Sequence, residues 1–143
     1  MALPFTDREL KRSFRELDSV ASPVGQPRGD SHRLLLFYAV ECGLKAVWLR
    51  RQNRRLFEHT DIAKTGHDLR CLLKELRVSA NLHPPQQYTL NSVSQNNQDI
   101  ARRGDITILH QVWRYGGQLA EPTAEVCEQA LVKILDWVKG ELT

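Results

Sequence analysis

The chain has 143 residues, a length typical of one domain, and 41% of them are hydrophobic. A helical domain of this size can bury a core without disulfides or structural metals. The formal net charge is only +3, which does not by itself indicate a nucleic-acid-binding protein. Residues 1–60 hold eleven lysines and arginines against seven acidic residues, so the basic excess lies towards the N-terminus. We interpret residues 1–143 as a single domain.

The cysteines give no sign of a metal centre. Cys42, Cys71 and Cys127 each fall within a predicted helix, and no Cys-x-x-Cys or mixed Cys/His cluster occurs. We therefore predict no metal and no cofactor. An odd number of cysteines on apolar faces is typical of reduced thiols in a reducing compartment. The N-terminus lacks an apolar segment of signal length, and the longest apolar run, Leu34–Val40, is too short to span a bilayer. These features predict a cytoplasmic protein that does not enter a membrane.

The first predicted helix runs from Thr6 to Val20. Thr6 and Glu9 have the spacing of a capping box, in which Thr6 caps the helix and Glu9 reaches back to it. The following segment, residues 21–30, contains two prolines and two glycines and is predicted to be a loop.

The second predicted helix, residues 31–55, is the strongest in the sequence. Asp30 or Ser31 can cap it, and apolar residues surround most of it between Leu34 and Leu49. We therefore expect it to be the central, most buried helix. Glu41 and Lys45 are four residues apart in the favourable order and are expected to pair on its polar edge.

The third predicted helix covers residues 68–77, with Thr65 or Asp68 as its cap and leucines at helical spacing. Residues 79–104 give a weaker signal, because two prolines are followed by a stretch rich in Asn, Gln and Ser. We expect this segment to be mostly loop, or to hold one weak helix over residues 87–93. It is also expected to be the least ordered internal segment, because it has the fewest apolar anchors.

Two more helices are predicted in the C-terminal part. Asp105 can cap a helix over residues 105–115, which the glycine pair at 116–117 would end. The last helix, residues 122–140, begins at Pro122 or Thr123 and has a broad apolar face. Together the elements predict an all-α fold, an antiparallel bundle of four to five helices without substantial sheet.

Three segments in this order resemble HEPN-domain proteins, and the resemblance covers residues 31–140. LLLFYAVECGLKAVWL resembles the central HEPN helix, TGHDLRCLLKEL resembles the helix that follows it, and HQVWRYGG resembles a helix end with Arg-Tyr before a turn. The resemblance implies an antiparallel bundle of four or five helices that is often dimeric. Many members are metal-independent ribonucleases of prokaryotic toxin–antitoxin, phage-defence or RNA-processing systems. Other members lack the catalytic pair and bind RNA, nucleotides or a protein partner.

HEPN nucleases carry an Arg, a spacer of four to six residues, and a His. In such a pair Arg stabilises the charge on the phosphorane, and His moves a proton near neutral pH. Three pairs in this sequence fit the spacing: Arg54 with His59, Arg77 with His83, and Arg103 with His110. Roughly 1.5 matches are expected by chance from this composition, so spacing alone is weak evidence.

Helical geometry favours the pair Arg103 and His110 as the catalytic residues. Seven residues are about two helical turns, so both side chains would share one face if the helix were continuous. The alternative is that Gly104 and Asp105 start the helix, which would leave Arg103 as a solvated loop charge and His110 as a half-buried helix residue.

Five further residues are candidates for binding RNA or a nucleotide: Arg114, Tyr115, Arg102, Arg54 and Arg55. Arginine is suited to phosphate, and an aromatic ring such as Tyr115 can stack on a base. The alternatives are structural. Tyr115 would be a packing anchor, Arg114 would pair with a carboxylate such as Glu41, and the arginines at 54 and 55 would be a solvated helix end.

We prefer a HEPN-like module that binds RNA, a nucleotide or a partner protein, with a metal-independent endoribonuclease as the alternative. Trp48, Trp113 and Trp137 exceed the needs of a minimal bundle. They lead us to expect a homodimer, or docking of an apolar helix face on a larger partner.

Overall fold

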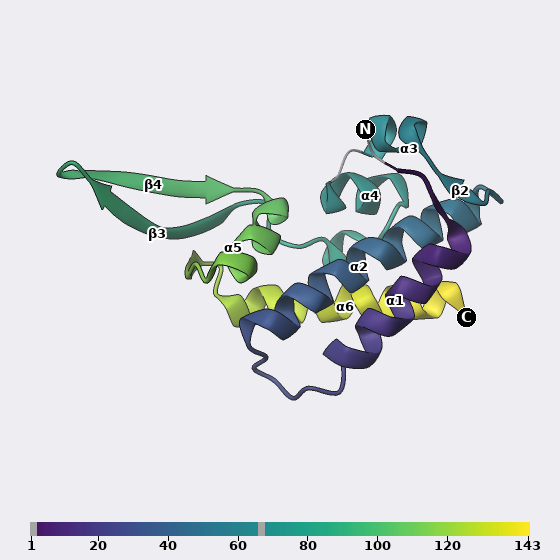
Figure 1. Ribbon diagram of the computed structural model, residues 1–143, viewed down its shortest axis with the longest axis horizontal. Helices are drawn as coiled ribbons and strands as arrows, with labels where there is room; N and C mark the ends of the chain where they lie inside the picture. The colour runs from purple at the N-terminus through teal and green to yellow at the C-terminus, as the bar shows by residue number, and fades with distance from the viewer. Residues whose placement is uncertain (1–2, 66–67) are drawn as a thin grey trace.

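The computed structural model describes residues 3–65 and 68–143 of the chain (Figure 1). The α-helices in this part are α1 Asp7–Ala21, α2 Asp30–Arg51, α3 His59–Thr65, α4 Leu69–Glu75, α5 Leu109–Tyr115 and α6 Ala124–Leu142. The β-strands are β1 Phe5–Thr6, β2 Leu56–Phe57, β3 Tyr88–Gln95, β4 Gln98–Gly104 and β5 Leu119–Glu121. Short 3-10 helices cover Ala80–Leu82 and Ile106–Ile108.

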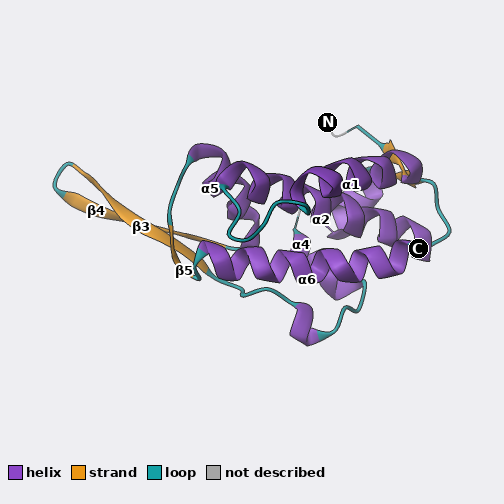
Figure 2. Ribbon diagram, turned by 90° about the horizontal axis from the view of Figure 1, so that it is seen from below, coloured by secondary structure: helices purple, strands orange, loops and turns teal. Residues whose placement is uncertain are grey.

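The fold is α+β, and the prediction of an all-α bundle is wrong. β1 and β2 form a small antiparallel sheet, and β4, β3 and β5 form a second antiparallel sheet in that order. The β3–β4 hairpin extends away from the helical body in both views (Figures 1 and 2).

Helix α2 is the centre of the helical body. It packs against α1, α6, α5 and α4, and none of its residues between Leu34 and Leu49 is exposed. Figure 2 shows α6 running along one side of α1 and α2. The predicted central position of this helix is therefore confirmed, and its apolar residues on all sides are explained by neighbours on several sides.

The helix ends agree with their predicted signals in most places. Thr6 Oγ1 accepts a hydrogen bond from the backbone N of Glu9 (3.1 Å), and Glu9 Oε1 accepts one from the backbone N of Thr6 (2.9 Å), so the capping box is confirmed. The side chains of Asp68, Asp105 and Thr123 each accept a hydrogen bond from a backbone N–H of the next turn. Gly116 ends α5 with a φ of +73°, a conformation that glycine adopts without strain.

Two predicted boundaries of the long helix are wrong. Its N-cap is Gly29, which offers no side-chain hydrogen bond, and Asp30 is its first residue. The helix ends at Arg51, because Asn53 has a φ of +52° and turns the chain back towards the N-terminus. This reversal brings Leu56–Phe57 alongside Phe5–Thr6 as the β1–β2 pair. The residues before α4, Gly66 and His67, lie outside the described part of the chain.

The segment predicted as a loop or weak helix contains the β3–β4 hairpin. Its turn is Asn96–Asn97, and both residues have a positive φ (54° and 64°), which a two-residue turn between twisted strands requires. Residues 91 and 92 lie opposite a single residue, Ala101, so a bulge interrupts the pairing. Only the base of the hairpin is anchored in the core: Tyr88 is fully buried, and β5 pairs with β3 over Thr89 and Leu90.

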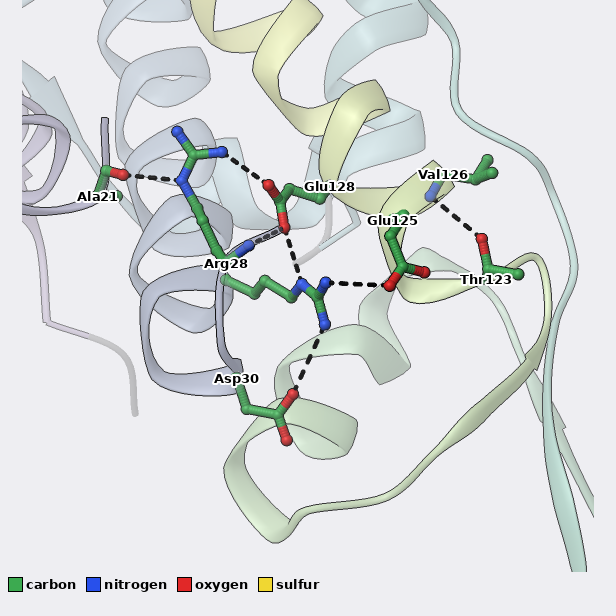
Figure 3. Close-up of polar contacts among 8 residues, drawn as sticks. Ala21, Arg28, Asp30, Thr123, Glu125, Val126 and Glu128 are labelled. Carbon is green, nitrogen blue, oxygen red and sulfur yellow. Dashed lines mark hydrogen bonds and ion pairs between the residues drawn. The ribbon is translucent and has the colours of Figure 1, made fainter. Parts of the chain in front are cut away.

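A buried cluster of charges joins the loop after α1 to α2 and α6 (Figure 3). Glu128 is 1% exposed and accepts hydrogen bonds from Arg28 Nη1 (2.8 Å), Arg33 Nε (2.8 Å) and the backbone N of Arg28 (3.0 Å). Arg28 Nε also donates to the carbonyl of Ala21 at the end of α1 (2.8 Å). The cluster lies at the end of the helical body where the chain passes from β5 into α6.

None of the helices in the described part of the chain combines the length and the apolar character that crossing a bilayer demands.

Candidate functional site

Helix α5 separates two pockets, because its polar side chains alternate between two faces. Side chains one turn apart share a face of a helix. His110 and Arg114 therefore line one pocket, whereas Gln111 and Tyr115 line another.

The first of these, the His110 pocket, has a volume of about 440 Å³. Its lining residues come from α2, the cap of α4, the 3-10 helix and α5: Phe37, Tyr38, Glu41, Asp68, Thr107, His110 and Arg114. The pocket therefore combines a histidine, an arginine, a phenol and two carboxylates, groups that can bind a polar ligand or transfer a proton.

The imidazole of His110 is held in one orientation. Its Nδ1 lies 2.6 Å from the carbonyl oxygen of Thr107, and its ring stacks on Phe37 with centroids 5.9 Å apart. A carbonyl oxygen only accepts hydrogen bonds, so Nδ1 carries the proton. In the neutral ring Nε2 is then an acceptor, which is the form that a general base needs.

The surroundings of His110 favour the neutral ring. Burial lowers the pKa of His110, and the positive charge of Arg114 lowers it further, while Glu41 partly opposes both. Arg114 Nη2 donates a hydrogen bond to the hydroxyl of Tyr38 (2.6 Å), so the guanidinium is held between α2 and α5. The carboxylate of Glu41 lies 3.3 Å from Lys45 Nζ, which confirms the predicted pair within α2.

The second of these, the hairpin pocket, lies between the base of the hairpin and α5 and has a volume of about 410 Å³. Its lining residues are Leu90, Ala101, Arg102, Arg103, Ile108, Gln111, Val112, Tyr115 and Gly117. Tyr115 is 76% exposed, the highest value among the large hydrophobic residues of the described chain. Its ring centroid lies 6.0 Å from the guanidinium carbon of Arg114. An aromatic ring and two hairpin arginines thus line one open pocket.

The structure places Arg103 and His110 in different pockets. Arg103 lies on β4 opposite Thr89, and the strand ends at Gly104 before Asp105 caps the next turn. No continuous helix joins the two residues, so the shared-face geometry does not occur. His110 is instead accompanied by Arg114, which is four residues further along the chain.

The other predicted residues have separate positions. Arg54 follows the C-terminal end of α2, away from α5 (Figure 1). Its Nη2 donates a hydrogen bond to Asp61 Oδ2 (2.6 Å). Arg55 is exposed, and its backbone carbonyl accepts a hydrogen bond from Asp7 N (2.8 Å). Arg102 donates from Nη2 to the carbonyl of Asn91 (2.8 Å) and is half-buried at the hairpin.

Sequence reasoning missed the contributions of Tyr38 and Asp68 to the His110 pocket. Tyr38 stands within an almost continuous apolar segment, and the sequence predicts Asp68 only as a helix cap. The available signal was the three-residue spacing of Tyr38 and Glu41, which places both on the polar edge of α2.

In residues 3–65 and 68–143, no three side chains of His, Cys, Asp or Glu gather closely enough to hold a metal ion. Comparisons with protein-family models, curated proteins and solved structures find no match to this chain. The resemblance to HEPN proteins therefore stays a hypothesis.

Proposed function

We propose that this chain is a binding module for single-stranded RNA, with Tyr115 as the platform on which a base stacks. The exposure of Tyr115 carries the proposal, because a ring that is 76% exposed contributes little to the chain's own packing. Stacking on an aromatic side chain is a common way to bind unpaired bases. Arg114 lies beside the ring, and Arg102 and Arg103 line the same pocket, so phosphates on either side of a stacked base would meet positive charge.

The HEPN resemblance supports RNA as the ligand and a prokaryotic toxin–antitoxin, phage-defence or RNA-processing system as the setting. The cytoplasm is the compartment we propose, since Cys42, Cys71 and Cys127 are free thiols.

The test is fluorescence anisotropy with a labelled single-stranded RNA of about twelve nucleotides at several salt concentrations. Tyr115→Ala should weaken binding by about 5- to 150-fold, the range for one lost stacking contact, whereas Tyr115→Phe should retain it. Arg102→Ala should weaken binding to all RNA sequences alike. It should also reduce the slope of log affinity against log salt concentration by about one.

The matched control is Arg15→Ala, which removes one exposed positive charge from α1, away from α5. It should leave the affinity within about twofold of wild type. Absence of binding at low salt, or equal affinities of wild type and Tyr115→Ala, would contradict the proposal.

A second candidate function is RNA cleavage in the His110 pocket, and the fixed orientation of His110 favours it. Its Nε2 would accept a proton from a ribose 2′-hydroxyl, whose oxygen would attack the adjacent phosphorus as the bond to the 5′-oxygen of the next nucleotide breaks. The protonated ring would then return the proton to the leaving 5′-oxygen. Arg114 in the same pocket would stabilise the additional negative charge of the transition state. In this proposed reaction Arg114, and not Arg103, is the cationic partner of His110.

Cleavage is tested by gel analysis of the same RNA with purified protein, with and without EDTA. The expected products are fragments ending in a 2′,3′-cyclic phosphate, formed equally in EDTA and absent with His110→Ala. Tyr115→Phe serves as the control that preserves binding. If His110→Ala cleaves as well as wild type, or if wild type does not cleave, the binding function alone is retained.

A further inference from the structure

The outer edge of β4 is an unpaired strand edge. The strand order is β4-β3-β5, so β4 has a neighbour on one side only among the strands that the structure describes. The part of β4 towards the turn stands away from the helical body with the rest of the hairpin, whereas Ala101, Arg102 and Arg103 line the hairpin pocket beside α5 (Figures 1 and 2). A strand edge of this kind presents backbone N–H and C=O groups to which another strand can pair.

The hairpin also carries apolar side chains that its own fold leaves uncovered. Val93 and Ile100 lie opposite each other across β3 and β4 and are 40% and 41% exposed. An isolated two-stranded ribbon is marginally stable in water, and further strands stabilise it. The unpaired edge of β4 and the exposed side chains of Val93 and Ile100 would both be satisfied by one further strand beside β4.

We propose that this neighbour is β4 of a second copy of the chain, paired antiparallel about a two-fold axis at Ala101. The sheet then continues across both copies in the order β5-β3-β4-β4-β3-β5. Ala101 lies at the bulge, where two residues of β3 oppose it in place of a single paired residue.

Charge complementarity selects this register. Pairing centred on Ala101 puts Asp99 opposite Arg103 of the second copy, and the two-fold axis repeats the pair on the other side. Neither Asp99 nor Arg103 forms an ion pair with any residue of the described chain, so both charges are available. Opposite charges that face each other across antiparallel strands stabilise the pair.

Registers shifted by one residue lose this match. A centre at Ile100 places Asp99 opposite Ala101 of the second copy, and a centre at Arg102 places two arginines against each other. Like charges directly opposite one another destabilise a strand pair. A strand from an unrelated protein would match only if it carried the same charge spacing, which a second copy provides automatically.

The same register covers the apolar pair. Side chains alternate between the faces of a strand, so Ile100 and Arg102 share the face opposite to that of Asp99 and Arg103. Ile100 then lies opposite Arg102 of the second copy, whose aliphatic stem can cover it. The two Ile100 side chains become diagonal neighbours, and each is flanked by its own Val93.

Disulfide trapping tests the register directly. In antiparallel pairs opposite Cα atoms lie about 4.5–5.5 Å apart, within the range that a disulfide spans. Ala101→Cys should therefore form a disulfide-linked dimer under mild oxidation. Wild type, with its three native thiols, and Ser94→Cys, with an exposed thiol on β3, should not. Cross-linking of Ser94→Cys to the same extent would overturn the register.

Light scattering over a range of concentrations tests the assembly and its charge pairs. Wild type should be a dimer, and Arg103→Asp should raise the dimer dissociation constant by roughly ten- to a hundredfold. The double variant Asp99→Arg with Arg103→Asp should restore dimerisation, and the control Arg15→Asp on α1 should not change it. A strictly monomeric wild type, an Arg103→Asp variant that dimerises as tightly as wild type, or an unrestored double variant would overturn the proposal. The outcome does not depend on RNA binding, because no RNA is present.

Discussion

At the scale of single residues, Asp61 explains why one of the predicted binding arginines has a structural role. The carboxylate is 1% exposed and accepts hydrogen bonds from Trp48 Nε1 (3.0 Å), the backbone N of Glu58 (2.8 Å) and Arg54 Nη2 (2.6 Å). Arg54 therefore completes a buried polar cluster that fixes the chain reversal after α2. A guanidinium held in this way is not free to follow an RNA backbone.

Acid should destabilise the protein partly through Asp61. The hydrogen bond from Arg54 is the main cause that lowers the pKa of Asp61 to about 2, whereas an aspartate in an unfolded chain titrates near 3.9. The unfolded state therefore binds the proton first as the pH falls. The stabilisation is complete above about pH 5 and is lost progressively towards pH 2. We expect the melting temperature to fall over this window.

Thermal melts of Asp61→Asn should show a lower melting temperature at pH 7 and a shallower loss between pH 5 and pH 2.5. Asp136→Asn, an exposed aspartate on α6, is the control and should behave as wild type. If Asp61→Asn follows the wild-type acid profile, Asp61 does not contribute to the pH dependence of stability.

At the scale of elements, Gly43 sets how closely α2 approaches its neighbours. A Cβ added at this position would lie 2.6 Å from Val138 Cγ1 on α6 and 2.8 Å from Phe14 Cδ1 on α1. Real Cβ atoms do not approach other carbons so closely, so three helices meet here because the side chain is absent. The valine is stiff at χ1 and cannot withdraw without moving its helix.

Gly43→Ala should therefore destabilise the protein by about 1–2 kcal/mol, even though alanine favours helix by about 1 kcal/mol over glycine. Gly140→Ala on α6 is the matched control, because no atom lies within 4 Å of its added Cβ. That change should be neutral or stabilise by up to about 1 kcal/mol. Urea denaturation of both variants measures their free energies of unfolding. Equal values would show that the helices move apart at Gly43 to accommodate the added methyl group.

At the scale of the whole molecule, the cluster of Arg28, Arg33 and Glu128 joins segments that are far apart in sequence. Burial raises the pKa of Glu128, but hydrogen bonds from Arg33 and Arg28 outweigh it and keep the pKa below the ordinary value. The carboxylate is therefore ionised at neutral pH, and it is the buried anion on which both arginines depend.

Glu128→Gln should destabilise the folded chain by about 3–5 kcal/mol, because it leaves Arg28 without a carboxylate and Arg33 with only the exposed ones of Asp30 and Glu125. Glu125→Gln is the comparison. Its side chain is 60% exposed and 3.8 Å from Arg33, so its loss should cost less than about 1 kcal/mol. Guanidinium denaturation at pH 7 separates the two. A small effect of Glu128→Gln would mean that water solvates the arginines instead.

The three tryptophans lie in or against the core and do not form a docking surface. Trp48 and Trp113 are 8% and 4% exposed and pack in the chain's own core, and Trp137 is half-buried. The tryptophans therefore supply no surplus apolar surface, and the homodimer stays a prediction that now depends on the β4 edge.

Local sequence by itself determined five of the six α-helices in the described part of the chain and most of their ends, whereas α3 was not predicted. The Thr6–Glu9 capping box, the Asp68 cap and the stop at Gly116 are confirmed because each depends on neighbours within four residues. The buried centre of α2 is confirmed for a similar reason, since apolar residues on every side of a helix require burial on every side.

Only the tertiary structure decided the hairpin and the grouping of the candidate residues. Residues 88–104 are mostly polar and exposed on both faces towards the turn, so no alternating pattern marked them as strands. β3 and β4 pair locally across a two-residue turn, but β5 joins the sheet from beyond α5. The separation of Arg103 from His110, and the meeting of His110 with Arg114 and Tyr38, follow from how α5 packs on α2. Contacts between segments distant in sequence carry no local signal, and therefore spacing along the chain could not reveal them.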